Sequence, residues 1–267
     1  MHQAKRDKYM ILNGELTLWQ PATEPFVYQD IHTLGLQSRY TQRHIDFLNI
    51  AGNNLFGKKL NASAETIEHQ IRELLKANRA LLNYTIGVRL SLDSDGNYRL
   101  EDYEATIYSG YVLRLLRPTA LCIASDVPWP AFPTSALLQT KQLADAIAQQ
   151  RDIHEALLTD SQGRITSDAT KPLILIREYT AIFSPTTQHS VESKLAVEAC
   201  RHINLECKFD HFTIDDAMQA DELLYVNYQG ITAFSKIGRH AYMDIIAANI
   251  ANAMEELFKM SNRNIPI

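Results

Sequence analysis

Two short apolar segments near the start of the chain are separated by an Asn-Gly pair. Residues 9–12 and 15–18 flank Asn13 and Gly14. This pair tolerates the positive φ angles that a two-residue turn between antiparallel strands requires. The pattern therefore predicts a β-hairpin at the start of the chain.

Two longer segments carry apolar residues at helical spacing. In residues 43–55, Ile45 and Leu48 fall on one face, and residues 64–82 carry a stronger apolar stripe. Ser63 precedes the second stripe, where a hydroxyl oxygen can accept from a free N–H of the first turn. The spacing predicts two amphipathic helices.

The remaining pattern divides the chain into two lobes, so that we expect a two-domain α+β protein. Extended segments after the second helix complete a small N-terminal lobe of residues 1–125. Residues 126–134 contain three prolines, which favours an interdomain linker. Residues 135–267 alternate between apolar strands and amphipathic helices, beginning with a helix at 135–150 and closing with one at 239–259. This second part is expected to form the larger lobe.

Composition narrows the possible partners. The chain has 267 residues, 46% of them hydrophobic, which is enough for a sizeable core. A formal net charge of -5 argues against nucleic acid as a partner, because no basic excess is available to neutralise phosphates. The absence of an apolar run of membrane-spanning length predicts no transmembrane segment. With no secretory leader pattern either, a cytoplasmic location is expected.

The sequence offers little support for metal or nucleotide chemistry. Three cysteines are too few and too irregularly spaced for a disulfide framework. No closely spaced histidine pair suggests a zinc site, so no metal is expected. No glycine-rich phosphate loop or nucleophile elbow occurs.

Four short segments, in their order along the chain, resemble the class IV aminotransferases. The opening Ile-Leu-Asn-Gly-Glu resembles the family's first hairpin, and Arg-His-Ile-Asp-Phe-Leu from Arg43 resembles its His-Ile-Asp-Arg-Leu helix. His-Glu-Ala-Leu-Leu from His154 resembles its Asp-Glu-Ala-Leu-Leu strand. Ala-Asp-Glu-Leu-Leu from Ala220 resembles its Ala-Asp-Glu-Val-Phe segment. The resemblance covers nearly the whole chain.

The resemblance implies a D-amino acid aminotransferase-like fold, that of the fold type IV pyridoxal phosphate enzymes. This fold combines a small N-terminal α/β lobe with a larger C-terminal lobe that contains a mixed, barrel-like sheet. It also implies a homodimer, pyridoxal phosphate as cofactor, and a small amino or keto acid as substrate if the chain is active.

Several cofactor-binding positions of the family carry different residues here. The family's phosphate-binding Arg corresponds to Phe47, and Arg43, one turn earlier, is the candidate substitute. The acid expected beneath the pyridine nitrogen corresponds to Ser167, with Asp168 adjacent. A hydroxyl does not hold a pyridinium proton as a carboxylate does, so Asp168 is the second candidate.

The phosphate-binding segments differ as well. The family's Gly-Ile-Thr-Arg helix start corresponds to residues 190–193, where Glu192 brings a negative charge. A later Thr pair corresponds to Tyr228 and Gln229, both of which retain hydrogen-bond donors.

The position of the cofactor-binding lysine depends on the alignment. Matching the linker places Leu137 or Leu138 there, which leaves one full-length helix after the linker. Matching Thr-Lys-Gln-Leu to the family's Ile-Lys-x-Leu instead makes Lys141 the Schiff-base residue. The first alignment predicts a degenerate homologue with a lost or altered cofactor site. The second predicts a divergent aminotransferase, or an aminodeoxychorismate lyase-like enzyme.

Overall fold

The computed structural model describes residues 8–81, 83–103, 105–166 and 168–263. Contacts divide the chain into two compact units, Met1–Ser109 and Gly110–Ile267. The predicted linker of residues 126–134 lies within the second unit.

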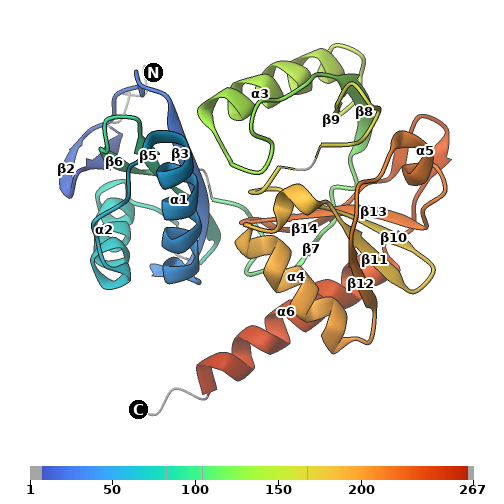
Figure 1. Cartoon of the computed structure of the whole chain (residues 1–267). Coiled ribbons are helices and arrows are strands. Elements are labelled where there is room, and N and C mark those ends of the chain that lie inside the picture. Colours follow the sequence, from blue (N-terminus) through green and yellow to red (C-terminus); the bar gives the residue numbers. More distant parts are fainter. Residues whose placement is uncertain (1–7, 82, 104, 167, 264–267) are drawn as a thin grey trace, which may run out of the picture. The chain divides into compact units, whose positions relative to one another are not determined.

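The first unit is an antiparallel six-stranded sheet with two helices packed on it (Figure 1). The strand order is β2-β1-β6-β5-β3-β4. The elements are β1 (Tyr9–Leu12), β2 (Glu15–Leu18), β3 (Phe26–Leu34), β4 (Gln37–Ser38), α1 (Thr41–Phe56), α2 (Ala64–Ala77), β5 (Thr85–Asp93) and β6 (Tyr98–Asp102).

Local sequence explains most boundaries of the first unit. Asn13 and Gly14 have φ angles of 50° and 95°, which confirms the predicted turn between β1 and β2. The Ser63 side chain accepts a hydrogen bond from the Thr66 N–H and so caps α2. The prediction that α2 reaches residue 82 is wrong. The helix ends at Ala77, because the Asn78 amide binds both backbone groups of Tyr9 on β1.

The second unit contains two open sheets. One has the order β12-β11-β10-β13-β14-β7 and the other the order β16-β15-β8-β9. The elements are β7 (Leu113–Arg114), β8 (Thr119–Ala124), α3 (Ser135–Gln149), β9 (Glu155–Thr159), β10 (Leu173–Arg177), β11 (Thr180–Phe183), η1 (Pro185–Thr187), α4 (Val191–His202), β12 (Glu206–Phe209), α5 (Ile214–Ala217), β13 (Glu222–Asn227), β14 (Gly230–Ala233), β15 (Lys236–Ile237), β16 (His240–Ala241) and α6 (Ile245–Arg263).

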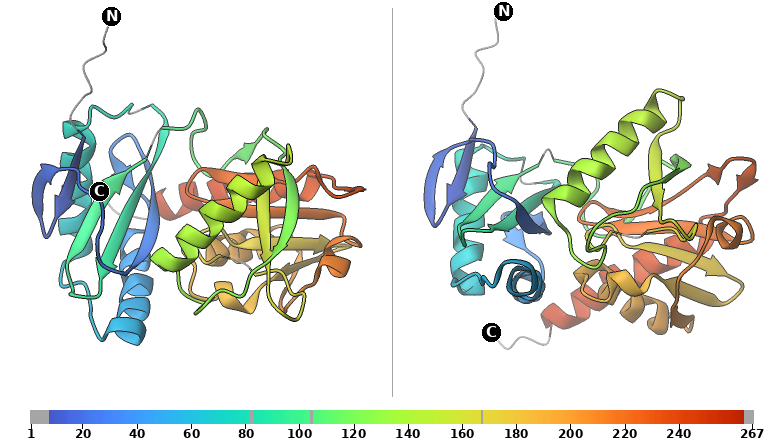
Figure 2. Two further views of the ribbon diagram at one scale, coloured as in Figure 1. Left: turned by 90° about the horizontal axis from the view of Figure 1, so that it is seen from above. Right: turned by 45° about the horizontal axis from the view of Figure 1, so that its top comes forward.

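Helices cover both sheets of this unit (Figure 2). Helices α4 and α6 pack on each other and against β13, while α3 packs on β8 and β9. The predicted mixed pairing is confirmed, since β13 pairs antiparallel with β10 and β14, and β14 pairs parallel with β7. Among the described residues, the sheets do not close into a barrel. The expected mixture of parallel and antiparallel strands is therefore present, but the expected barrel-like closure is not.

The closing helix begins later than predicted. Residues 240 and 241 form β16, and α6 starts only at Ile245. The buried Glu222 carboxylate accepts the N–H groups of Ile246 and Ala247, at 2.7 and 2.9 Å, and so fixes the start of α6. None of the helices in the described part of the chain is both long and apolar enough to cross a bilayer.

Candidate functional site

Helix α3 carries a lysine into the interior of the second unit. Thr134 caps the helix by accepting from the Leu137 N–H at 3.2 Å. Leu137 and Lys141, four residues apart, lie on the face that packs against β9. The Lys141 side chain is only 18% exposed, so it is largely shielded from solvent.

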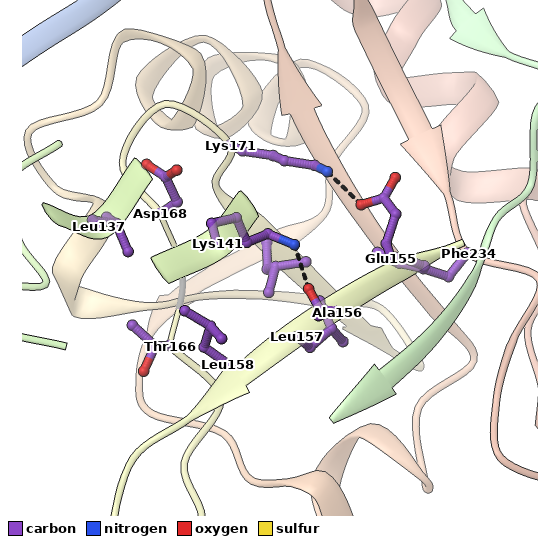
Figure 3. Close-up of a pocket in the computed structure, with 11 residues that line it drawn as sticks. Leu137, Lys141, Glu155, Ala156, Leu157, Leu158, Thr166, Asp168, Lys171 and Phe234 are labelled. Carbon is purple, nitrogen blue, oxygen red and sulfur yellow. Dashed lines mark hydrogen bonds and ion pairs between the residues drawn. The ribbon is translucent and has the colours of Figure 1, made fainter. Parts of the chain in front are cut away.

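The Lys141 ammonium is held by two acceptors. It donates to Asp145 Oδ1 at 2.8 Å. It also donates to the Ala156 carbonyl (Figure 3). Asp145 also accepts the Ala156 N–H at 2.7 Å, which ties α3 to β9. Burial and the nearby cation Lys171 lower the pKa of Lys141, and the Asp145 carboxylate opposes this shift. The amine is therefore easier to deprotonate than an exposed lysine.

A second cation lies beside it, paired with a carboxylate and a phenol. Lys171 forms an ion pair with Glu155, and its Nζ lies 3.9 Å from the ring centroid of Tyr225. Tyr225 donates its hydroxyl to Glu155 Oε1 at 2.7 Å. Burial is the largest single influence on the pKa of Glu155 and acts to raise it, but Lys171, the Tyr225 hydroxyl and Lys141 together outweigh it, so the net shift is downward. Burial and the neighbouring Glu155 raise the pKa of Tyr225.

These groups border a small cavity that is partly open to solvent. The polar lining consists of Lys141, Glu155, Thr166, Asp168 and Lys171 (Figure 3). The rest of the wall is apolar and consists of Leu137, Ala156, Leu157, Leu158, Leu173 and Phe234. The cavity thus combines an apolar interior with two amines and two carboxylates.

Two residues that the sequence singled out separately meet at this cavity. Lys141 comes from α3 and Asp168 from the loop before β10. Asp168 is fixed by accepting from the Thr170 N–H at 2.8 Å and from the Thr170 hydroxyl at 3.1 Å. Leu137 lines the same cavity, whereas Ser167 lies outside the described residues.

The start of α4 is buried and already hydrogen-bonded within itself. The Ser190 hydroxyl accepts from the Ser193 N–H at 3.1 Å, and the Ser193 and Thr187 hydroxyls lie 3.2 Å apart. Glu192 occupies the first turn and is 2% exposed. An acidic side chain in its ionised form is favoured at this end of a helix by the dipole.

The other predicted residues lie elsewhere in the fold. Arg43 is exposed on α1 of the first unit, with its guanidinium 5.4 Å from the Tyr40 ring centroid, and Phe47 is buried on the same helix. Tyr228 and Gln229 form the turn between β13 and β14, where the Gln229 N–H donates to Asn227 Oδ1 at 3.0 Å. None of these four residues lines the cavity.

Sequence reasoning did not identify Asp145, Glu155, Lys171 or Tyr225 as site residues. Glu155 stands inside a segment that resembles a family motif, but nothing in that motif indicates a buried ion pair. Lys171 precedes β10 as part of a polar loop, and its pairing with Glu155 depends on how β9 and β10 are brought together. No cluster of metal-ligating side chains is present among the residues that the structure describes.

Comparison with known proteins agrees with this architecture. The family model for amino-transferase class IV matches residues 39–237. No curated protein sequence matches the chain. The branched-chain aminotransferase from Thermoproteus uzoniensis with norvaline is similar in structure, with a TM-score of 0.75, 13% identity, and coverage of 94% of this chain and 95% of that one.

Two further branched-chain aminotransferases are similar. The Escherichia coli enzyme has a TM-score of 0.71 at 12% identity and covers 96% of this chain and 94% of its own. The Thermobaculum terrenum enzyme, in a mutant form, has a TM-score of 0.72 at 14% identity and covers 97% of both chains. At these identities the structural likeness defines the fold alone. The family model covers most of the chain, which therefore belongs to the class IV aminotransferase family.

Proposed function

We propose that this chain is a class IV aminotransferase homologue with an altered cofactor site, which binds another ligand or a protein partner and does not hold pyridoxal phosphate in the family's manner. The observation that carries the proposal is Glu192. This acidic side chain is buried in the first turn of α4, the segment that resembles the family's phosphate-binding helix start.

A phosphate dianion is poorly matched to this helix start. Phosphates bind helix N-termini because free N–H groups and the positive end of the dipole face them. An ionised carboxylate about 5 Å away would repel the dianion by about 3 kcal/mol per unit charge at an effective dielectric constant of about 20. Ser190 and Ser193 are already engaged with each other. The residues at this turn therefore do not fit the cofactor's phosphate.

The other family positions add support. Phe47 is buried and apolar where the resemblance expects a cationic residue. Leu137, one of the two residues placed by the linker alignment at the lysine position, has no amine and is 2% exposed. A loss at one position could be compensated by a neighbour, whereas losses at the phosphate and the lysine together remove both main attachments of the cofactor.

An absorbance experiment tests the proposal. The purified protein is incubated with pyridoxal phosphate, passed through a desalting column and scanned from the near-ultraviolet to the visible, before and after borohydride. We expect no retained cofactor band. Glu192→Gln, which keeps the size of the side chain and removes its charge, is expected to retain more cofactor than the unmodified protein. A stoichiometric band in the unmodified protein would contradict the proposal.

A second candidate function is favoured by a specific observation. Lys141 has a lowered pKa and lines the same cavity as Asp168, which is adjacent to the position of the family's ring-nitrogen acid. A divergent aminotransferase, or an aminodeoxychorismate lyase-like enzyme, would use Lys141 as its cofactor lysine and a small amino or keto acid as substrate.

A pair of lysine variants separates the two candidates. If Lys141 holds the cofactor, Lys141→Ala abolishes a borohydride-stable adduct. The matched control Lys171→Arg keeps the ion pair with Glu155 and is expected to retain the adduct. An adduct that survives Lys141→Ala eliminates the enzyme candidate in this form.

A further inference from the structure

A second cavity of the second unit lies where two pairs of parallel strands end. Strands β8 and β9 pair in parallel, and their last residues, Ala124 and Thr159, are opposite each other. Strands β11 and β12 also pair in parallel and end together at Phe183 and Phe209. One residue within two positions of each end lines this strand-end cavity, namely Asp126, Asp160, Ser184 and His211. Ligands of open sheets bind preferentially outside the carboxyl ends of parallel strands.

The strand-end cavity is large enough for a small ligand. Its volume is about 230 Å³, several times the roughly 30 Å³ that a water molecule occupies in the liquid, and one side is open to solvent. The apolar part of the wall consists of Val127, Pro130 and Ile165. The polar part consists of Asp126, Asp160, Ser161, Arg164, Thr166, Ser184, Thr186 and His211. Only Thr166 is shared with the lining of the cavity that contains Lys141.

An arginine of this wall is fixed in place by a neighbouring carboxylate. The Arg164 Nε donates to Asp160 Oδ2 at 2.7 Å, and its Nη2 lies 2.6 Å from the same oxygen. Asp160 Oδ1 accepts the N–H groups of Gln162 and Arg164, each at 2.9 Å. The Nη1 group of Arg164 takes no part in this ion pair. Arg164 therefore supplies oriented N–H donors whose positive charge is already balanced.

The other polar groups of the wall include acceptors and hydroxyls. Asp126 Oδ1 accepts the Ser161 N–H at 2.8 Å, which joins the loops after β8 and β9. The Asp126 Oδ2 atom takes no part in that contact, and the residue is exposed. The Ser184 and Thr186 hydroxyls, in the loop after β11, lie 2.8 Å apart. A hydroxyl both donates and accepts, so the wall offers donors and acceptors to the same ligand.

This combination selects a neutral ligand. Asp126 and Asp160 repel an anion, and Arg164 repels a cation. The described residues contain no cluster of side chains that would hold a metal ion. Sugar hydroxyls can donate to a carboxylate and accept from a guanidinium, and the apolar part of the wall can contact the C–H groups of the ring. An acidic side chain beyond a parallel strand is also the group that binds ribose hydroxyls in dinucleotide-binding folds.

We propose that the strand-end cavity binds a sugar ring through a vicinal diol of the ribose type, with Asp126 accepting from the diol and Arg164 donating to it. None of the described residues at the family's cofactor positions lines this cavity. The inference therefore goes beyond the proposed function and does not depend on whether the chain holds pyridoxal phosphate.

Pairs of ligands that differ by one hydroxyl test this inference. The full chain is titrated with adenosine and 2′-deoxyadenosine, and with D-ribose and 2-deoxy-D-ribose, by calorimetry and ligand-observed NMR. Each deoxy compound is expected to bind at least about tenfold more weakly, because its loss leaves polar groups of the site without partners. Tighter binding of adenosine than of ribose would support a nucleoside as the source of the diol, and equal binding would support the free sugar. Equal affinity within each pair, or no binding of either diol at about 10 mM, would overturn the inference.

A variant and its control locate the site. Asp126→Asn keeps an oxygen for the Ser161 N–H and removes the charge, so adenosine and ribose are expected to bind about tenfold more weakly. Asp215→Asn makes the same change at an exposed residue of α5 that does not line the cavity, and it should leave both affinities unchanged. Undiminished binding in Asp126→Asn would contradict the assigned site.

Discussion

Each unit of the molecule buries a cation against a carboxylate and a tyrosine ring. In the first unit, the Arg89 guanidinium binds Asp30 through two nitrogens, at 2.8 and 2.9 Å, and lies 3.9 Å from the Tyr28 ring centroid. In the second unit, Lys171 pairs with Glu155 and lies 3.9 Å from the Tyr225 ring centroid. In both, a tyrosine hydroxyl also donates to the carboxylate, from Tyr103 in the first unit.

The two arrangements differ in what the cation can do. An arginine remains charged at any ordinary pH, and its planar fork matches a carboxylate, so the first pair is suited to joining β3 and β5. A lysine can lose its proton when its environment becomes unfavourable. The second pair borders the cavity and has a second lysine, Lys141, near it. The first arrangement is therefore built for stability, and the second keeps titratable amines at a cavity.

The chain's two tryptophans allow this comparison to be measured one unit at a time. Trp19 lies in the first unit and Trp129 in the second. Variants that carry Trp129→Phe report unfolding through Trp19, and variants that carry Trp19→Phe report it through Trp129.

Removal of the carboxylate in the first unit is expected to have the largest effect. Asp30→Ala leaves a buried guanidinium that cannot deprotonate, so we expect a loss of about 3–5 kcal/mol in the free energy of unfolding. Urea denaturation followed through Trp19 measures it, and the loss should be nearly constant between pH 7 and 9. A loss below about 1 kcal/mol would show that the pair contributes no more than an exposed ion pair.

The equivalent change in the second unit should cost less. Glu155→Ala removes the counter-charge of Lys171, but lysine can release its proton, which limits the loss to about 2–3 kcal/mol at pH 7. The loss should shrink as the pH rises toward 9, when followed through Trp129. If the loss in the free energy of unfolding did not depend on pH, the expected difference between Arg89 and Lys171 would be contradicted.

Acid should weaken the first unit through a different group. His44 is buried, and burial lowers its pKa to about 3 from the ordinary 6.5, so the folded state binds fewer protons than the unfolded state between these values. Stability should therefore fall as the pH drops through this window, by about 2 kcal/mol between pH 7 and pH 5. The His44→Gln variant should lose less stability than the unmodified protein between pH 7 and pH 5. If the free energy of unfolding changed with pH in the same way in both proteins, the effect could not be assigned to His44.

Local patterns predicted the elements of both units more reliably than their ends. The hairpin, the N-cap at Ser63 and the main helices follow from residues within a few positions of one another. The end of α2 and the start of α6 depend on Asn78 binding Tyr9 and on Glu222 binding Ile246. Such contacts join segments that are distant in sequence, and a single sequence does not show them.

The same limit applies to the cavity. Lys141 and Asp168 could be identified from the sequence because the resemblance to the family points to the segments that contain them. Glu155, Lys171 and Tyr225 come from β9, the loop before β10, and β13, and they meet only once the sheets are formed. No periodicity distinguishes a lysine that pairs inside the fold from one that faces water, so the buried pairs had no signal in the sequence.

The tyrosine hydroxyls provide the smallest and most selective test of the comparison. Tyr225 donates to Glu155 at 2.7 Å, whereas Tyr103 donates to Asp30 at 3.2 Å, where the carboxylate is already bound by the two guanidinium nitrogens. A hydrogen bond to a charged group contributes about 1.5–3 kcal/mol, so Tyr225→Phe should cost about 1.5 kcal/mol and Tyr103→Phe less than about 1 kcal/mol. Both changes keep the ring, so they isolate the contribution of the hydroxyl.

Tyr225→Phe should also raise the pKa of Glu155, which NMR titration of the carboxyl carbon can follow. Equal costs at the two positions would show that Glu155 depends on Lys171 alone, and that the phenol contributes nothing specific to the lining of the cavity.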